Sequence, residues 1–447
     1  MRFTRRRPDR RVGRALFAAH ILAAGGLAAS CSSEERLAAT STDAMTDAAP
    51  EAASADGGGI DAPAFLEAGT VDAAPLPVTC TSTPCARTLV TTLGADLEDR
   101  GEGFCALLDD GTVACWGANG AGQLGRGDEA GSADSANAAR VVGLSRVASL
   151  DHTCAVDLDG AVWCWGTGPF LRPDAGAPTT ERTPVKLDLP PATKVGMSHA
   201  TACAAVGDGV RCWGSDADGQ LGPRAATADA GLSSLVPLPT GAPVQALAVG
   251  KAVFALREDG SLVTWGANPP LGRMSPIFPD RSPQNIDVGG VDSVDLVHDN
   301  ACMVAGGTGY CWGAPLPGAT SELDRAIPEP IVTPEPIVQI ATTRTTVQET
   351  LGVQRYRWCA SGVSGDLYCW GANDSGQAGD GTMSYALEAV KVQGLPERVA
   401  QVKTTPNTTC ALLTNGKVFC WGGNYNGQLG NGENRGRALT PVEVILP

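Results

Sequence analysis

The stretch CALLDDGTVACWGANGAGQLGRG, residues 105–127, decides the fold, because it returns near the other end of the chain as CALLTNGKVFCWGGNYNGQLGNG, residues 410–432. In both copies two cysteines flank a turn that ends in glycine, and Trp-Gly follows the second cysteine. Short β-prone runs around such a turn predict a β-hairpin, in which glycine supplies the left-handed backbone conformation. Folding the first copy about Asp110 places Cys105 opposite Cys115, at a separation that a disulfide can span.

The cysteines of the whole chain follow this pairing. Fourteen of the fifteen form seven close pairs: Cys80 with Cys85, Cys105 with Cys115, Cys154 with Cys164, Cys203 with Cys212, Cys302 with Cys311, Cys359 with Cys369, and Cys410 with Cys420. One unit lacks both cysteines together and carries Phe254 and Thr264 in their places, as bonded partners should. Zinc sites favour Cys-x2-Cys spacing, which these pairs lack. We therefore expect seven disulfides made in an oxidising compartment, with free thiols or metal binding as the alternatives.

Trp-Gly is the second repeated feature. It recurs at Trp116, Trp165, Trp213, Trp265, Trp312, Trp370 and Trp421. Repeats of about fifty residues indicate stacked units that bury their faces against one another. Gly-Gln-Leu-Gly segments follow several of the Trp-Gly pairs, and segments such as TPVKLDLP are typical of outer strands. Three or four short strands in each of seven units predict an all-β, seven-bladed β-propeller over residues 87–447.

The combined pattern of CAL, CWG, GQLG and a later Pro-Val resembles the repeat of the regulator-of-chromosome-condensation family. The resemblance covers residues 87–447 and implies a ring closed by pairing TPVEVILP, residues 440–447, beside ARTLVTTLG, residues 86–94, in one blade. Members of that family include a GTPase exchange factor, a chromatin binder, light sensors and exported bacterial propellers that inhibit β-lactamases. The resemblance therefore implies a rigid ring that presents loops to a protein partner, and the fold alone does not choose among these roles.

The N-terminal part has a different composition. Seven arginines precede the apolar segment ALFAAHILAAGGLAAS and then Cys31, which predicts a lipoprotein-type signal peptide over residues 1–31, with Cys31 as the lipidated residue. An ordinary signal peptide with an unmodified cysteine is the alternative. Residues 32–86 are rich in Ala, Asp and Ser and predict a flexible linker. We expect an exported protein of the cell envelope that contacts a membrane only through its lipid, and Ser32 and Ser33 favour the outer membrane.

The charge of the chain limits its partners. The formal net charge is −15, and without residues 1–31 there remain 33 − 7 = 26 basic and 48 − 1 = 47 acidic residues, a balance of −21. A nucleic-acid-binding protein needs a basic surface to neutralise phosphates, so we expect no nucleic-acid partner. The glycine-rich segment 119–127 lacks the Lys-Ser or Lys-Thr of a phosphate loop, and no metalloprotease or serine-hydrolase motif is present. We expect no catalytic residue, no metal and no cofactor.

Two groups of polar residues have simpler explanations than chemistry. His152, His199 and His298 each lie two to four residues before a hairpin cysteine, and this repetition favours a structural role. The Asp-Gly pairs at Asp110, Asp159 and Asp259 are interpreted as turns, with metal binding as the alternative. The same turns resemble the Asp boxes of propeller hydrolases, so a sialidase-type enzyme is an alternative function.

The units that depart from the repeat are the candidates for recognition. Those at Trp165, Trp265 and Trp312 lose the Gly-Gln-Leu-Gly segment, and an insertion over residues 342–358 precedes Trp370. Loops on a rigid scaffold often carry recognition, and arginine and aromatic side chains often anchor interfaces. The candidate partner contacts are Phe170, Phe278, Arg344, Arg355 and Tyr356. We expect a monomeric, non-catalytic propeller that binds a protein or a surface glycan, with regulation of a small GTPase as a further alternative and drift of surface loops as the simpler reading of these departures.

Overall fold

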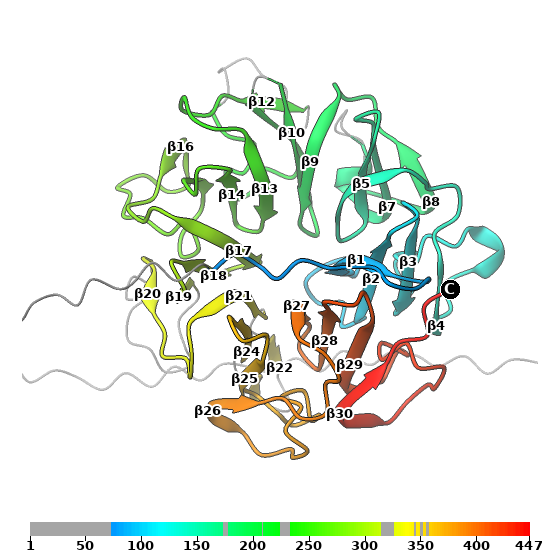
Figure 1. Ribbon diagram of the computed structural model, residues 1–447. Helices are drawn as coiled ribbons and strands as arrows, with labels where there is room; N and C mark the ends of the chain where they lie inside the picture. Colours follow the sequence, from blue (N-terminus) through cyan, green and yellow to red (C-terminus); the bar gives the residue numbers. More distant parts are fainter. Residues whose placement is uncertain are drawn as a thin grey trace, which may run out of the picture. The chain divides into compact units, whose positions relative to one another are not determined.

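The computed structural model describes residues 73–447 except 173–177, 208, 224–232, 314–325, 344–345, 349–351 and 355–356. The expectations for the signal peptide, Cys31, Arg344, Arg355 and Tyr356 fall outside the described residues. Seven four-stranded antiparallel sheets follow one another around a ring and form the expected seven-bladed β-propeller (Figure 1). Among the described residues no helix is long and apolar enough to cross a membrane.

The blades take their strands in chain order. The first blade contains β1 Ala86–Thr91, β2 Gly103–Leu108, β3 Val113–Gly117 and β4 Ser135–Arg140. The second contains β5 Val147–Asp151, β6 Cys154–Asp157, β7 Val162–Gly168 and β8 Thr179–Lys186. The third contains β9 Ala192–Met197, β10 Thr201–Val206, β11 Gly209–Gly214 and β12 Ser234–Val236. The fourth and fifth contain β13 Val244–Val249, β14 Ala252–Arg257, β15 Leu262–Gly266 and β16 Asp280–Asn285; and β17 Val291–Val297, β18 Asn300–Ala305, β19 Thr308–Gly313 and β20 Glu329–Pro330. The sixth contains β21 Ile337–Thr342, β24 Arg357–Gly362, β25 Leu367–Gly371 and β26 Ala386–Lys391, and the seventh β27 Val399–Thr404, β28 Thr408–Leu413, β29 Val418–Gly423 and β30 Arg437–Glu443. Two strands, β22 Thr346–Gln348 and β23 Gly352–Gln354, form a separate hairpin, and two single 3-10 turns are η1 Asp128–Ala130 and η2 Pro169–Leu171.

The second and third strands of each blade form the hairpin expected from the sequence. Cys105 lies directly opposite Cys115, and five further cysteine pairs take the same register. All six are disulfides with Cα atoms 4.0–4.1 Å apart, and Cys80–Cys85 is a seventh, outside the hairpins. In the remaining blade Phe254 lies opposite Thr264, so the two missing cysteines do come from one opposed pair.

The hydrophobic core is divided among the seven interfaces between neighbouring blades. At six of these interfaces the hairpin disulfide of one blade packs with the Trp-Gly indole of the next, as Cys105 and Cys115 do with Trp165. At the remaining interface Phe254 replaces the disulfide and stacks on Trp312, with ring centroids 5.7 Å apart. The disulfides therefore contribute buried surface to blade packing as well as a covalent link within each hairpin.

Closure of the ring differs from the expectation. Strand β30 pairs only with β29 and strand β1 only with β2, so residues 440–447 and 86–94 do not share a blade. Both end blades already contain four strands of their own, which leaves no vacancy for a strand from the other end. The ends meet instead through an ordinary blade interface, where the Trp116 indole N–H donates to the Gln428 carbonyl at 3.0 Å.

Contacts of the propeller also extend before residue 87. Val78 packs against the core cluster that joins the last blade to the first, and the Thr79 N–H donates to the Thr414 carbonyl at 2.8 Å. The disulfide Cys80–Cys85 follows directly. These residues lie in the segment expected to be linker, and the structure packs them onto the ring.

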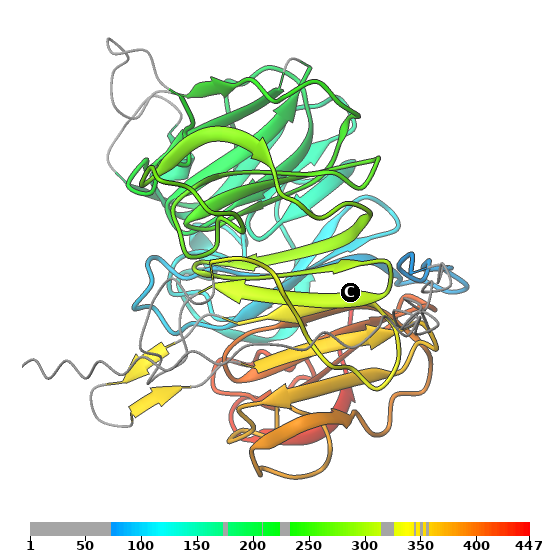
Figure 2. The same cartoon turned by 90° about the vertical axis from the view of Figure 1, so that its left-hand side faces the viewer.

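The two faces of the ring differ in their connections. Because each sheet is antiparallel, the connections from first to second strand and from third to fourth strand lie on one face, which we call the pocket face. The hairpin β22–β23 belongs to this face, since it lies between β21 and β24, the first and second strands of the sixth blade. Figure 2 shows that hairpin, in yellow, extending away from the blades.

Candidate functional site

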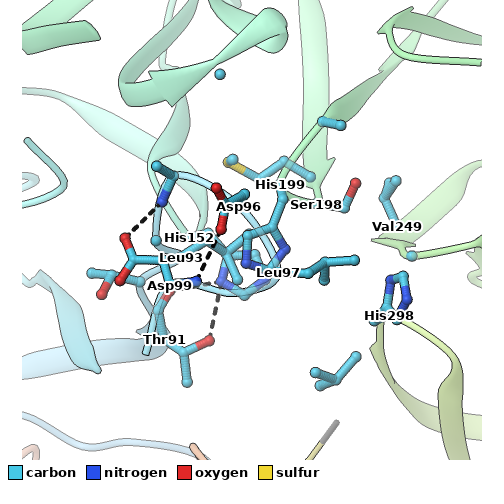
Figure 3. Close-up of a pocket in the computed structure, with 18 of the residues that line it drawn as sticks. Thr91, Leu93, Asp96, Leu97, Asp99, His152, Ser198, His199, Val249 and His298 are labelled. Atoms are coloured by element: carbon cyan, nitrogen blue, oxygen red, sulfur yellow. Dashed lines mark hydrogen bonds between the residues drawn. The ribbon is translucent and has the colours of Figure 1, made fainter. Parts of the chain in front are cut away.

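A cavity of about 690 Å³ opens at the centre of the pocket face, and all seven blades contribute residues to its lining (Figure 3). Most of these residues come from the ends of the first strands and from the connections to the second strands, including 91–102, 197–200, 249–250, 296–298 and 404–407. The first strands lie nearest the centre of the ring and the fourth strands at its rim (Figure 1). The cavity therefore lies at the ring axis, where loops from distant parts of the sequence meet.

One long loop forms a large part of the lining. Residues 92–102 connect β1 to β2, whereas only two residues connect β5 to β6. The loop is held by its own carboxylates. Asp99 accepts hydrogen bonds from the N–H groups of Ala95 and Gly101 at 2.9 and 2.8 Å. Asp96 accepts from the N–H groups of Glu98 and Asp99, each at 2.9 Å. Short-range hydrogen bonds of this kind fix turns, so the loop has a defined shape.

The three histidines expected to be structural meet at this cavity. His152 lies in the turn after β5 with a left-handed φ of 47°, and its Nδ1 is 2.7 Å from the Thr91 carbonyl oxygen. A carbonyl only accepts, so Nδ1 carries the proton and the Nε2 of the neutral ring is an acceptor. The hydrogen bond to the first blade supports the structural role of His152. The gathering with His199 and His298 was not foreseen, although their common position before a hairpin cysteine was the available signal.

Buried charges lie within the blades near the axis. Lys403 of β27 contacts Asp295 of β17 at 2.7 Å, which joins the seventh blade to the fifth. Burial alone would lower the pKa of Lys403, but the charge and hydrogen bond of Asp295 outweigh this, and the pKa of Lys403 is raised. Arg357 is 1% exposed, and burial lowers its pKa to about 9, partly offset by the charge of Glu102. These groups bind different blades together.

Phe170 is not a partner contact, and its burial corrects that expectation. Its side chain is 2% exposed, and its backbone carbonyl accepts a hydrogen bond of 2.7 Å from the Trp213 indole. In other blades the carbonyl of the glutamine in Gly-Gln-Leu-Gly has this role, as Gln123 does for Trp165 at 2.9 Å. Phe170 therefore occupies the glutamine position of the repeat in a unit whose sequence lacks Gly-Gln-Leu-Gly.

The divergent segment after Trp265 keeps the same hydrogen bond to the Trp-Gly indole of the next blade. Pro270 accepts from the Trp312 indole at 2.8 Å, and Leu271 next to it is fully buried. After Leu271 much of the connection from β15 to β16 is exposed, and the side chain of Phe278 in it is 73% exposed. Of the five candidate contacts, Phe170 is thus internal and Phe278 is on the pocket face, whereas the remaining three fall outside the described residues.

Two glutamine side chains of the repeat bond to the next blade. Gln220 donates to the Gly250 carbonyl of the next blade at 3.1 Å, and Gln377 donates to the Pro406 carbonyl at 3.3 Å. In all four of these glutamines, Gln123, Gln220, Gln377 and Gln428, the side-chain oxygen also accepts from the backbone N–H two residues before. Of these four residues, two therefore bond to the next blade through the side-chain amide.

The Asp-Gly pairs form turns, as interpreted. Asp110 accepts from the N–H and hydroxyl of Thr112 at 2.9 and 2.6 Å, and Asp259 makes the same two bonds with Ser261. The hydrogen bonds to Thr112 and to Ser261 lower the pKa of Asp110 and of Asp259. These turns connect second to third strands and so lie on the face opposite the cavity. In the described ranges no group of three His, Cys, Asp or Glu side chains could hold a metal.

Known proteins with similar sequences or structures agree with the propeller fold described above. The family model described as Regulator of chromosome condensation (RCC1) repeat matches residues 399–428 and, in a second form, residues 415–447. Together with the seven repeating blades, this decides the class. The chain is an RCC1-type repeat propeller. It is similar to the ultraviolet-B receptor UVR8 of Arabidopsis thaliana, 28% identical over 76% of this chain and 79% of that one.

Further similarities of the RCC1-type propeller are weaker or shorter. The human E3 ubiquitin-protein ligase HERC2 is 27% identical over 72% of this chain, which spans only 7% of HERC2. Among solved structures, human WBSCR16 superposes with a TM-score of 0.59 at 19% identity, over 75% of this chain and 95% of that one. Yeast RCC1 (Prp20) bound to Kap60 gives 0.59 at 18% identity, over 79% and 87%. At such identities the structural likeness shows the fold alone.

Proposed function

We propose that this RCC1-type propeller is an exported, lipid-anchored, non-catalytic protein that binds a protein partner through its pocket face. One observation carries the proposal: the exposed aromatic side chains gather on that face. Among the described residues, the exposed large aromatics are Phe278, Tyr385 and Tyr425, at 73%, 41% and 58%. All three lie in connections between third and fourth strands. Aromatic side chains are enriched in protein interfaces and often carry their binding energy.

Aliphatic side chains extend the same surface. Met274 and Ile277 are 70% and 61% exposed in the loop of Phe278, and Leu97 is 43% exposed at the cavity. On the opposite face the exposed large apolar residues are Val142, Leu158, Val332 and Ile445, all of them aliphatic. Apolar residues scattered singly need no explanation, but a face that combines three aromatics with a central cavity favours recognition.

The loop that carries Phe278 is ordered before any partner arrives. Arg273 and Asp280 form an ion pair of 2.6 Å, with side chains 11% and 4% exposed. The Ser275 hydroxyl donates to Asp280 at 2.8 Å, and the Ile277 N–H donates to Ser275 at 3.2 Å. A preorganised loop loses less conformational entropy on binding, so its apolar tip is suited to act as an anchor.

Export and lipid anchoring are supported by the sequence and the cysteines. The first 31 residues have the pattern of a lipoprotein signal, and the remaining fourteen cysteines are paired as seven disulfides. Protein binding accords with solved relatives, since one structure holds yeast RCC1 bound to Kap60. Regulation of a GTPase rests on analogy alone. Nor does the lining of the cavity favour a sialidase: its described residues include Arg100 as the one arginine and no tyrosine.

The test compares the two faces. The mature chain, beginning at Cys31, is used to capture proteins from its own cell envelope, followed by mass spectrometry. We expect a partner that the native protein retains and that the double variant Phe278→Ser, Tyr425→Ser loses. The matched control is Leu158→Ser, which removes a side chain that is 66% exposed on the opposite face. Equal capture by all three proteins would contradict the proposal.

Anchoring and export have their own measurement. Cells grown with radiolabelled palmitate should label the native chain but not the Cys31→Ser variant. The mature protein should show no reactive thiol until it is denatured and reduced. Labelling that persists without Cys31, or free thiols in the exported protein, would disprove this half of the proposal.

A further inference from the structure

We infer that the central cavity receives a lysine or arginine side chain of the protein partner. This inference rests on the proposed function, because it names the chemistry that the pocket face recognises. It starts from the charge of the lining. The described residues of the cavity include five carboxylates and one cationic side chain, Arg100: the carboxylates are Asp96, Glu98, Asp99, Glu102 and Asp218. A cavity with this excess favours a cation.

Two of these carboxylates are available at the mouth. Asp96 and Glu98 are both exposed, and neither forms a salt bridge with any residue that the structure describes. Glu102, by contrast, is 5% exposed and is bonded to the turn of the seventh blade. Asp96 uses one oxygen, Oδ1, for both loop N–H groups. The loop therefore holds the Asp96 carboxylate at a defined position beside the cavity, and Glu98 lies two residues further along the same loop.

The walls suit the rest of a basic side chain. Leu93, Leu97, Val249 and Leu296 line the cavity together with the three histidines, and Figure 3 shows Leu97 pointing into the space toward Val249 and His298. Lysine and arginine bury their aliphatic stems along apolar surface while their charged ends keep polar partners. A volume of about 690 Å³ also lies within the roughly 300–1,000 Å³ typical of binding pockets.

His152 adds an acceptor to this environment. Nδ1 of His152 donates to the Thr91 carbonyl, so Nε2 is an acceptor whenever the ring is neutral, and it lies 4.0 Å from Oδ1 of Asp151. Guanidinium and ammonium groups have donors and no acceptors, so they match both a neutral imidazole nitrogen and a carboxylate. The strongly acidic chain, with a formal charge of −15, would further attract a basic partner before contact.

The histidines also provide a site-specific probe. The chain has four, His20 lies in the predicted signal peptide, and the other three all line this cavity. The experiment records imidazole NMR signals of the full mature protein, labelled with ¹³C-histidine, during titration with four peptides: Gly-Gly-Arg-Gly-Gly and its Lys, Gln and Glu counterparts. We expect saturable shifts with the Arg and Lys peptides only, weakened by added salt.

Charge variants decide whether the carboxylates are responsible. Asp96→Asn with Glu98→Gln should weaken binding of the Arg peptide about threefold or more, as expected for exposed ion pairs. Asparagine retains the oxygen that holds the loop, so the variant should fold. The control, Asp188→Asn with Glu397→Gln, removes the same charge from exposed residues on the opposite face and should leave binding unchanged.

The outcomes separate this inference from the proposed function. Shifts that are equal for the Arg and Gln peptides, the absence of any shift, or equal weakening in both charge variants would overturn the inference. If this occurs while Phe278 and Tyr425 remain necessary for capture, the partner binds the pocket face by other chemistry. If the basic peptides bind as expected but no partner is captured, the cavity chemistry stands and the proposed function fails.

Discussion

Glu102 of the first blade and Arg357 of the sixth blade both bind one turn of the seventh, the connection between β27 and β28. The Glu102 carboxylate accepts from the Thr405 hydroxyl at 2.5 Å and from the Asn407 N–H at 3.0 Å. Arg357 donates to the Thr405 carbonyl through Nε at 3.0 Å and to the Thr408 carbonyl. Two buried charges thus tie three blades together at the ring closure, where no shared strand joins the ends.

We predict that Arg357→Met lowers the free energy of unfolding by about 3 kcal/mol or more, because it leaves the buried carbonyls of Thr405 and Thr408 without their donor and removes the positive charge that acts on Glu102. Urea denaturation of the oxidised protein measures the change. The matched control is Arg87→Met, in which an exposed arginine of β1 is replaced and the effect should stay within about 0.5 kcal/mol. If the free energy of unfolding fell by the same amount in the two variants, the buried bonds of Arg357 would not be what stabilises the ring closure.

The opposed pair Phe254 and Thr264 should accept an eighth disulfide. Their Cα atoms pair in the register of the cysteines in the other blades, so Phe254→Cys with Thr264→Cys should oxidise spontaneously on export. The gain of about 3 kcal/mol from closing the loop is offset by the lost stacking of Phe254 on Trp312, so stability should change little. Mass spectrometry counts the bond as a loss of two hydrogens, and Thr264→Cys alone should retain one free thiol. A double variant with two free thiols would contradict the register.

Replacing Phe170 by alanine should lower the stability of the protein strongly, whereas the same substitution at Phe278 should have little effect. Phe170→Ala creates a cavity in the core between the second and third blades and should cost about 3–5 kcal/mol. Phe278→Ala changes an exposed tip and should stay within about 0.5 kcal/mol. Thermal and urea unfolding measure both. Comparable destabilisation by the two variants would mean that the exposed loop is part of the packed core, contrary to the structure.

Asp280 should make the stability of the folded protein depend on pH in the acid range. Burial alone would raise the pKa of Asp280, but hydrogen bonds from Arg273 and Ser275 outweigh it, and the pKa is lowered below its usual 3.8. A lowered pKa stabilises the folded state above the unfolded pKa, and this contribution is lost as the pH falls through the folded value. We therefore predict that stability declines below about pH 4 and that Asp280→Asn flattens this part of the pH profile. An unchanged acid limb in the variant would exclude Asp280 as a contributor.

The sequence by itself determined the repeating unit. A hairpin is a local structure, so the cysteines around each Gly turn indicated their own partners, and Phe254 and Thr264 took the same register as the bonded pairs. The number of Trp-Gly pairs gave the number of blades, because each blade is one contiguous segment of chain. The Asp-Gly turns followed from the same short-range rules.

Tertiary structure alone decided what happens between blades. Phe170 and Phe278 are both aromatic residues of divergent loops, and only packing against Trp213 places one inside and leaves the other exposed. His152, His199 and His298 lie in three different blades and meet because the ring turns the same connection of each blade toward one axis. The way in which the ring closes depended on whether the first and last blades each had four strands of their own. Strand pairing between the two ends of the chain is a long-range property that the local sequence does not specify. Hairpins are specified by neighbouring residues, whereas the cavity and the closure arise from surfaces that meet only after the whole ring has formed.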